Sequence, residues 1–187
     1  MSGKPASPTP RRFARFNVPD PGGDYQALPD DGMCLSAFLV LRPSGHGGQV
    51  LLGRIDPAAP WAEVGGLSAE RVARIGDRWM LPSSQLLVFE SPAEAARRIV
   101  REQLGTSLHD LRGPAVFSEA YPRGTAGRVD PHWDLHFVFE GHWPEMTFPR
   151  SRMFRALGFV DIARTPRSEI ARAQADILEL VGLSPAP

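Results

Sequence analysis

The sequence is poor in several features that define large protein classes. Its 187 residues include one cysteine, Cys34, so the chain cannot form an internal disulfide. Lys4 is its only lysine, and every other basic residue is an arginine, which we interpret as a compositional bias of the source. Because Cys34 lies in the apolar run of residues 33–41, a buried strand thiol is favoured over a reactive nucleophile.

The sequence also lacks a net charge and a long hydrophobic run. Its 21 Lys and Arg residues balance 21 Asp and Glu residues, so no overall field would attract nucleic acid or an anionic membrane. The run of residues 33–41 is far shorter than the roughly 20 apolar residues that cross a bilayer. Residues 1–32 contain proline, glycine and charge in place of the apolar core of a signal peptide. A cytoplasmic location is therefore expected.

The apolar content is sufficient for one buried domain. Hydrophobic residues make up 42% of the chain, and its length is short for two domains. We expect an N-terminal arm over residues 1–32, a domain over residues 33–183, and a tail over residues 184–187.

Hydrophobic patterns predict the elements of this domain. Residues 34–41 and 49–55 are rich in strand-forming residues, and the turn-rich segment between them predicts a hairpin. A short amphipathic helix is expected within residues 67–79. The further predicted elements are strands at residues 115–121, 132–139 and 154–162 and a final helix from Thr165 and Pro166 to about Val181.

The clearest helix signal begins at Ser91. Ser91 is a good N-cap, Pro92 suits the first helical position, and Glu94 is placed to complete a capping box. The pattern continues to about Leu104, and Gly105 suits the helix end.

A longer motif contains this helix. From Ser84 to Thr106 the sequence resembles the Nudix box, G-x5-E-x7-R-E-U-x-E-E-x-G-U, in which U is a bulky apolar residue. The matching positions are Glu90, Arg98, Val100, Glu102 and Gly105. The preceding Trp79-Met80-Leu81-Pro82 is similar to the family's usual lead-in. The resemblance implies an α+β fold, a Nudix-like α/β/α sandwich whose mixed central sheet is covered by the box helix and a C-terminal helix.

The box departs from the pattern where the family binds metal. Ser84 replaces the first glycine, Ile99 and Gln103 replace two of the three clustered glutamates, and Thr106 is a weak mismatch. The resemblance implies that Glu102 and Gln103 are the remaining ligand positions for Mg²⁺ or Mn²⁺, with Glu102 as the remaining catalytic carboxylate. Positions 99, 102 and 103 share one helix face. One carboxylate and one amide beside an apolar side chain predict weak or absent metal binding.

Glu90, Arg98 and Gly105 have a structural role by the same resemblance. In the family, the residues matching Glu90 and Arg98 form a buried salt bridge that holds the box loop on its helix. Their presence indicates the fold and not the chemistry.

Other carboxylates are candidates to complete a catalytic site. By position these are Glu119, Asp130, Asp134 and Glu140, with Glu140 as a candidate catalytic residue and Asp134 as a candidate metal ligand. His132, Asp134 and His136 alternate along a predicted strand, so they face the same side of a sheet. A polar strand face that lines a cleft is favoured over a metal site there.

Basic and aromatic residues suggest how a ligand would be held. Arg98 and Arg101 are candidate phosphate contacts, and Trp133 is a candidate to stack on a base. The expected partner is a small phosphate-containing ligand, with a homodimer left open.

Three functions remain on the sequence alone. The first is a Nudix-like protein that binds a nucleoside-diphosphate-linked or similar ligand with pyrophosphohydrolase activity weak or lost. The second is an active Mg²⁺- or Mn²⁺-dependent hydrolase that uses Glu102 with recruited acids. The third is a protein-interaction domain with a vestigial cleft.

Overall fold

A computed structural model describes residues 33–45, 48–87, 89–121, 132–144, 148, 150–171 and 173–187, with the side chains of residues 120, 121 and 132 excepted. The predicted N-terminal arm lies outside these residues, as does Asp130. The proposed boundaries of the arm and tail therefore stay predictions.

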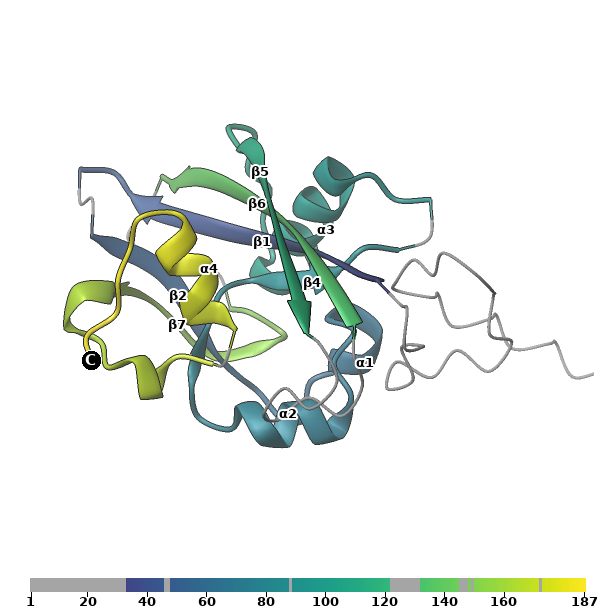
Figure 1. Ribbon diagram of the computed structural model, residues 1–187, viewed down its shortest axis with the longest axis horizontal. Coiled ribbons are helices and arrows are strands. Elements are labelled where there is room, and N and C mark those ends of the chain that lie inside the picture. Colours follow the sequence, from purple (N-terminus) through teal and green to yellow (C-terminus); the bar gives the residue numbers. More distant parts are fainter. Residues whose placement is uncertain are drawn as a thin grey trace, which may run out of the picture.

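Four strands form a mixed sheet in the order β4-β1-β6-β5 (Figure 1). These strands are β1 (Met33–Pro43), β4 (Ser83–Gln85), β5 (Arg112–Tyr121) and β6 (His132–Trp143). Parallel pairing joins β1 to β6, whereas β4 and β5 pair antiparallel with their neighbours. The two central strands therefore have both edges hydrogen-bonded.

A second, antiparallel sheet has the order β3-β2-β7. Its strands are β2 (Gln49–Ile55), β3 (Trp79–Met80) and β7 (Phe154–Asp161). Both strands of the predicted hairpin exist, but β1 and β2 belong to different sheets, so the hairpin pairing was wrong. Residues on both faces of β1 and β2 are buried. Such continuous apolar runs indicate a strand without specifying its neighbour.

Side chains on the two faces of β1 enter different cores. One face carries Ala37, Leu39 and Leu41, which join the cluster that includes Ile99, Val100 and Leu104 of α3 (Pro92–Leu104). The other face carries Phe38 and Val40, which join Ile177 and Leu178 of α4 (Gln174–Leu180). The strand alternation thus separates an α3 face from an α4 face.

Two short helices precede the box. They are α1 (Trp61–Val64) and α2 (Ala69–Ile75). The second confirms the helix expected within residues 67–79, and the Ser68 side chain caps it by accepting a hydrogen bond from the backbone N–H of Arg71.

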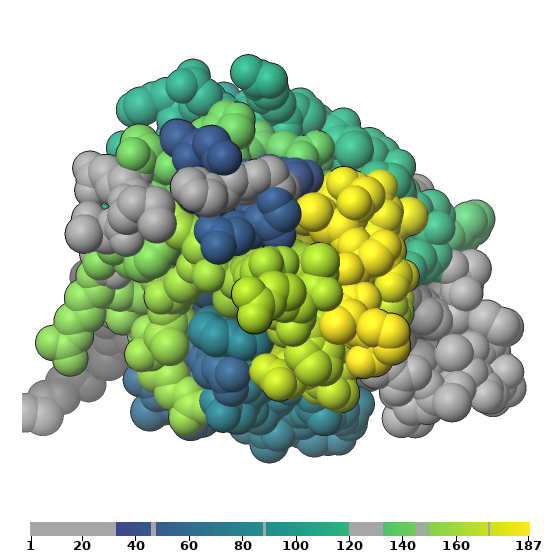
Figure 2. Space-filling model, turned by 90° about the vertical axis from the view of Figure 1, so that its left-hand side faces the viewer, coloured from purple at the N-terminus to yellow at the C-terminus, as the bar shows by residue number. Residues whose placement is uncertain are grey.

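The final helix is much shorter than predicted. Two 3₁₀ turns, η1 (Ile162–Arg164) and η2 (Arg167–Glu169), come first, and α4 begins only at Gln174. Ile170 is instead in a β-bridge with Trp79, and the N–H of Ala171 donates to the Trp79 carbonyl. This tertiary pairing overrides the helical periodicity. Figure 2 shows the C-terminal residues, in yellow, packed beside this segment, where Ala186 hydrogen-bonds to the backbone of both Thr165 and Arg167.

The observed class is α+β, as predicted, with a mixed sheet and helices on both of its faces. It differs in detail, because the strands are divided between two sheets rather than one. In the described part of the chain, no helix has the length and apolar character required to span a bilayer.

Candidate functional site

The helix α3 is fixed at both ends by the predicted caps. The Glu94 N–H donates to Ser91 Oγ, and Glu94 Oε2 accepts from the Ser91 N–H at 2.9 Å, which completes the capping box. These hydrogen bonds from Ser91 lower the pKa of the Glu94 carboxyl. Gly105 ends the helix with a φ of 70°, in the left-handed region that favours glycine.

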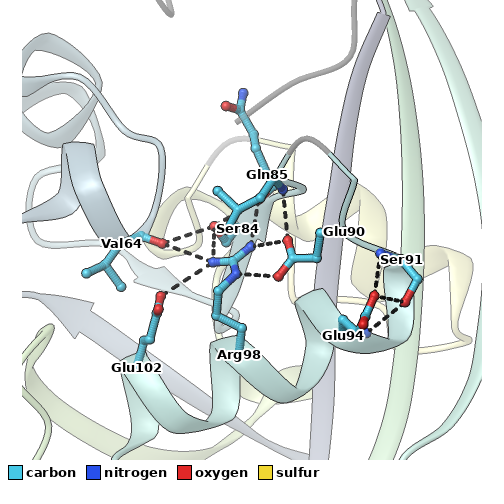
Figure 3. A network of polar contacts seen from close by, with 9 residues as sticks. Val64, Ser84, Gln85, Glu90, Ser91, Glu94, Arg98 and Glu102 are labelled. Atoms are coloured by element: carbon cyan, nitrogen blue, oxygen red, sulfur yellow. Dashed lines mark hydrogen bonds and ion pairs between the residues drawn. The ribbon is translucent and has the colours of Figure 1, made fainter. Parts of the chain in front are cut away.

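Arg98 lies at the centre of a buried polar network beneath α3 (Figure 3). Its Nε and Nη2 donate to the two carboxylate oxygens of Glu90 at 2.6 and 2.8 Å. The remaining N–H groups reach Ser84 Oγ, the Gln85 carbonyl, the Val64 carbonyl and Glu102. Burial lowers the pKa of Arg98, but the hydrogen bonds and charge of Glu90 more than offset this and raise it.

This network holds the box loop on the helix. Glu90 Oε2 also accepts from the Leu87 N–H at 2.8 Å, so the carboxylate joins the loop to Arg98. Because every guanidinium N–H is engaged, Arg98 has no donor left for a ligand.

A second cluster of polar side chains lies on the face of the four-stranded sheet opposite α3. Glu119 on β5 is directly opposite Asp134 on β6, and His136 is two residues further along β6. One ligand atom from each of the three side chains lies within 4.8 Å of the others. Among the residues that the structure describes, these three side chains form a group whose donor atoms could hold a metal ion.

The surroundings of this cluster are buried and polar. The Cys34 and Ser36 positions of β1 pair with Asp134 and His136, and Gln85 Nε2 donates to Cys34 Sγ at 3.1 Å. Burial raises the pKa of the Cys34 thiol, and the charge of Asp134 raises it further. In Figure 3 the Gln85 side chain points away from the Arg98 network, as strand alternation requires.

An open depression lies beside the N-terminal half of α3. It has a volume of about 340 Å³ and is lined by Leu87, Phe89, Glu90, Glu94, Arg97 and Arg101. Phe89 is fully exposed. No hydrogen bond or salt bridge joins the side chain of Arg97 or Arg101 to the residues that the structure describes, although the charge of Arg97 contributes to lowering the pKa of the neighbouring Glu94 carboxyl. The depression therefore presents two cationic side chains and an aromatic ring to solvent.

Comparison with solved structures identifies this architecture. A MutT Nudix hydrolase from Burkholderia pseudomallei has a TM-score of 0.53 at 19% identity, over 80% of this chain and 98% of that one. A Nudix hydrolase from M. Smegmatis, RenU, has a TM-score of 0.51 at 17% identity, over 80% and 84%. The chain has the Nudix fold.

A third similar structure is a bifunctional NMN adenylyltransferase/ADP ribose pyrophosphatase from Francisella tularensis. Its TM-score is 0.51 at 15% identity, over 79% of this chain and 40% of that chain. No family model matches the sequence. No curated protein matches it either.

The side chains at the metal positions that the Nudix resemblance predicts are buried or engaged in polar contacts. Ile99 is fully buried in the core beneath α3. The Gln103 amide is also fully buried, and it donates to the Ser83 carbonyl at 2.7 Å while accepting from the Ser83 N–H at 3.2 Å. Glu102 is part-exposed and lies 3.5 Å from Arg98. Of positions 99, 102 and 103, only Glu102 carries a carboxylate, and it lies beside the Arg98 guanidinium.

The other predicted Nudix-site residues are dispersed. Glu140 lies on the face of β6 opposite the α3 face, where it forms a 3.1 Å salt bridge with Arg42, so it does not join Glu102. Trp133 is half-exposed and donates to Ser118 Oγ at 2.6 Å. Asp134 instead lies beside Glu119 and His136. The side chain of His132 lies outside the described residues.

Proposed function

We propose that this protein is a Nudix-fold binding protein for a small phosphate-containing ligand, in which metal-dependent pyrophosphate hydrolysis by the box is weak or lost. The observation that carries the proposal is the pair of hydrogen bonds between the Gln103 amide and the Ser83 backbone.

The Gln103 amide makes both hydrogen bonds at once because it carries a donor and an acceptor, which an ionised carboxylate does not. A carboxylate at position 103 would keep the acceptor for the Ser83 N–H but would set a negative oxygen against the Ser83 carbonyl. Mg²⁺ needs near-octahedral oxygen coordination and gives up its water reluctantly. With Ile99 in the core, too few oxygen atoms remain on this helix face to compensate.

The ligand class follows from the surface beside the helix. Arg97 and Arg101 are one helical turn apart, so their guanidinium groups project from the same face of α3. Two such groups suit a diphosphate, because each can make paired charge-assisted hydrogen bonds to phosphate oxygens. The exposed Phe89 ring adds a surface on which a base can stack.

The test combines turnover with binding. Purified protein is incubated with nucleoside diphosphate derivatives, including ADP-ribose, with Mg²⁺ or Mn²⁺, and both product release and the melting temperature are measured. We expect a ligand-dependent rise in melting temperature without turnover. The rise should disappear in the Arg97→Gln, Arg101→Gln double variant and persist in the control Arg152→Gln, which removes an exposed arginine elsewhere.

Two results would overturn this proposal in favour of its competitors. Turnover at rates typical of enzymes that Glu102→Gln abolishes would show an active hydrolase. The absence of both turnover and a thermal shift across the panel would favour a protein-interaction domain.

A further inference from the structure

We propose that Glu119, Asp134 and His136 bind a divalent transition-metal ion, with Zn²⁺ as the best match. The site lies on the face of the four-stranded sheet opposite α3, and the box contributes none of these ligands. The pairing of β5 with β6 brings the three side chains together, because Glu119 is opposite Asp134 and His136 follows on the same face.

The spacing of the donor atoms suits one small ion. His136 Nε2 and Glu119 Oε2 are 3.5 Å apart. Two ligands about 2.1 Å from a tetrahedral ion are roughly 3.4 Å apart, so this pair already has the required separation. All three donors lie within 4.8 Å of one another, so a small adjustment of the side chains would bring them to one ion.

The His136 ring supplies an independent indication of a ligand. Its side chain is only 5% exposed, and although Nε2 lies 3.5 Å from Glu119 Oε2, neither ring nitrogen makes a hydrogen bond in the described part of the chain. A buried polar group without a partner is costly, and native proteins usually satisfy such groups. The Phe38 ring packs nearly perpendicular to the imidazole, with the ring centroids 5.1 Å apart. A metal ion bound at Nε2 would satisfy that nitrogen.

The donor set selects the kind of ion. Two carboxylates and a neutral imidazole carry two negative charges, which a divalent ion neutralises. Imidazole favours Zn²⁺ and related transition metals, whereas Mg²⁺ and Ca²⁺ prefer oxygen ligands alone. Three protein ligands leave a fourth position for water or for an oxygen atom of a ligand, as in catalytic zinc sites.

The experiment uses the full chain without a polyhistidine tag. After dialysis against a chelator, the protein is titrated with Zn²⁺, Mn²⁺ and Mg²⁺ by calorimetry, and its melting temperature is measured with each ion. We expect one Zn²⁺ per chain, bound more tightly than Mn²⁺ and far more tightly than Mg²⁺. Zn²⁺ at about 100 times its dissociation constant should raise the melting temperature by roughly 5–11 °C.

Variants identify the ligands. His136→Gln and Asp134→Asn should each weaken Zn²⁺ binding by at least about 100-fold, because losing a direct ligand exceeds the 10–100-fold effect of an outer-shell change. The control His142→Gln removes an exposed imidazole from the same strand and should leave binding unchanged. Equal affinity in the wild type and the two ligand variants would refute the site.

A second measurement does not depend on the variants folding. Co²⁺ added to the wild-type protein should give the visible absorption of a four-coordinate ion, and Zn²⁺ should abolish that absorption. Absence of any Zn²⁺ or Co²⁺ binding by the wild type overturns the proposal. Nucleotide binding beside α3 is measured separately, so either proposal can fail alone.

Discussion

The substitution Gln103→Glu tests the central structural observation, since it restores one glutamate of the box. The variant keeps an acceptor for the Ser83 N–H but loses the donor to the Ser83 carbonyl. An unmade buried hydrogen bond costs about 1–3 kcal/mol. Because position 103 is fully buried, the new carboxyl should remain protonated well above its ordinary pKa.

Protonation of the new carboxyl at position 103 limits how much the Gln103→Glu substitution can lower the free energy of unfolding. A protonated carboxyl can donate to the Ser83 carbonyl as the amide does. Protonating a glutamate of ordinary pKa about 4.3 at pH 7 costs about 3.7 kcal/mol. We therefore expect the free energy of unfolding to fall by about 1–4 kcal/mol at pH 7, or roughly 2–15 °C in melting temperature. Because the folded pKa of this acid is raised, the deficit should grow above pH 4.3 and nearly vanish below it.

Chemical denaturation at pH 4.5, 7 and 8 measures this dependence. Gln103→Met removes both hydrogen bonds without adding a charge, so its deficit should not vary with pH. Glu102→Gln alters a part-exposed position on the same helix, keeps an oxygen acceptor for Arg98 and should change stability by less than about 1 kcal/mol. A Gln103→Glu protein as stable as the wild type at pH 8 would refute the reasoning. Selective recovery of its stability by Mg²⁺ would show that the box with a restored glutamate binds an ion.

Three further predictions concern residues that stabilise α3 and the strands beside it. Arg98→Ala should lower the free energy of unfolding by about 3–5 kcal/mol, because it leaves Glu90 charged and buried. Chemical denaturation measures this change, and a variant as stable as the wild type would contradict the prediction. Ser91→Ala should cost about 1 kcal/mol through loss of the N-cap, measured by thermal unfolding. Cys34 should react slowly with a charged thiol reagent in the native state, and stability should fall as pH rises above about 8.5, since burial and Asp134 raise its pKa; Cys34→Ala should remove that pH dependence.

The features that sequence analysis predicted well are determined by neighbouring residues. The capping box from Ser91 to Glu94 and the glycine end at Gly105 are local signals with fixed spacing, and α3 begins and ends where they indicate. The Glu90–Arg98 pair also came from a local motif. Such features need no knowledge of which strands pair.

The features that sequence analysis missed depend on strand register and tertiary contacts. Alternation placed Asp134 and His136 on one face, but only the pairing of β5 with β6 brings Glu119 opposite Asp134. Similarly, the backbone pairing of Ile170 and Ala171 with Trp79 replaces the expected first turns of the final helix. A one-residue shift in register would reverse the faces, so no local pattern could have specified this cluster.

The segment before the box, residues 81–83, is hydrogen-bonded by the side-chain amides of two glutamines, one from α3 and one from the start of α4. Gln103 of α3 holds the backbone of Ser83, and Gln174 of α4 accepts from the Leu81 N–H at 3.0 Å. In the family pattern this loop and the helix glutamates converge on a metal ion, whose charge joins them. In this chain, hydrogen bonds from Gln103 and Gln174 connect the segment to α3 and α4. These contacts agree with the proposal that the geometry around α3 does not depend on a bound ion, because hydrogen bonds alone connect the segment to both helices.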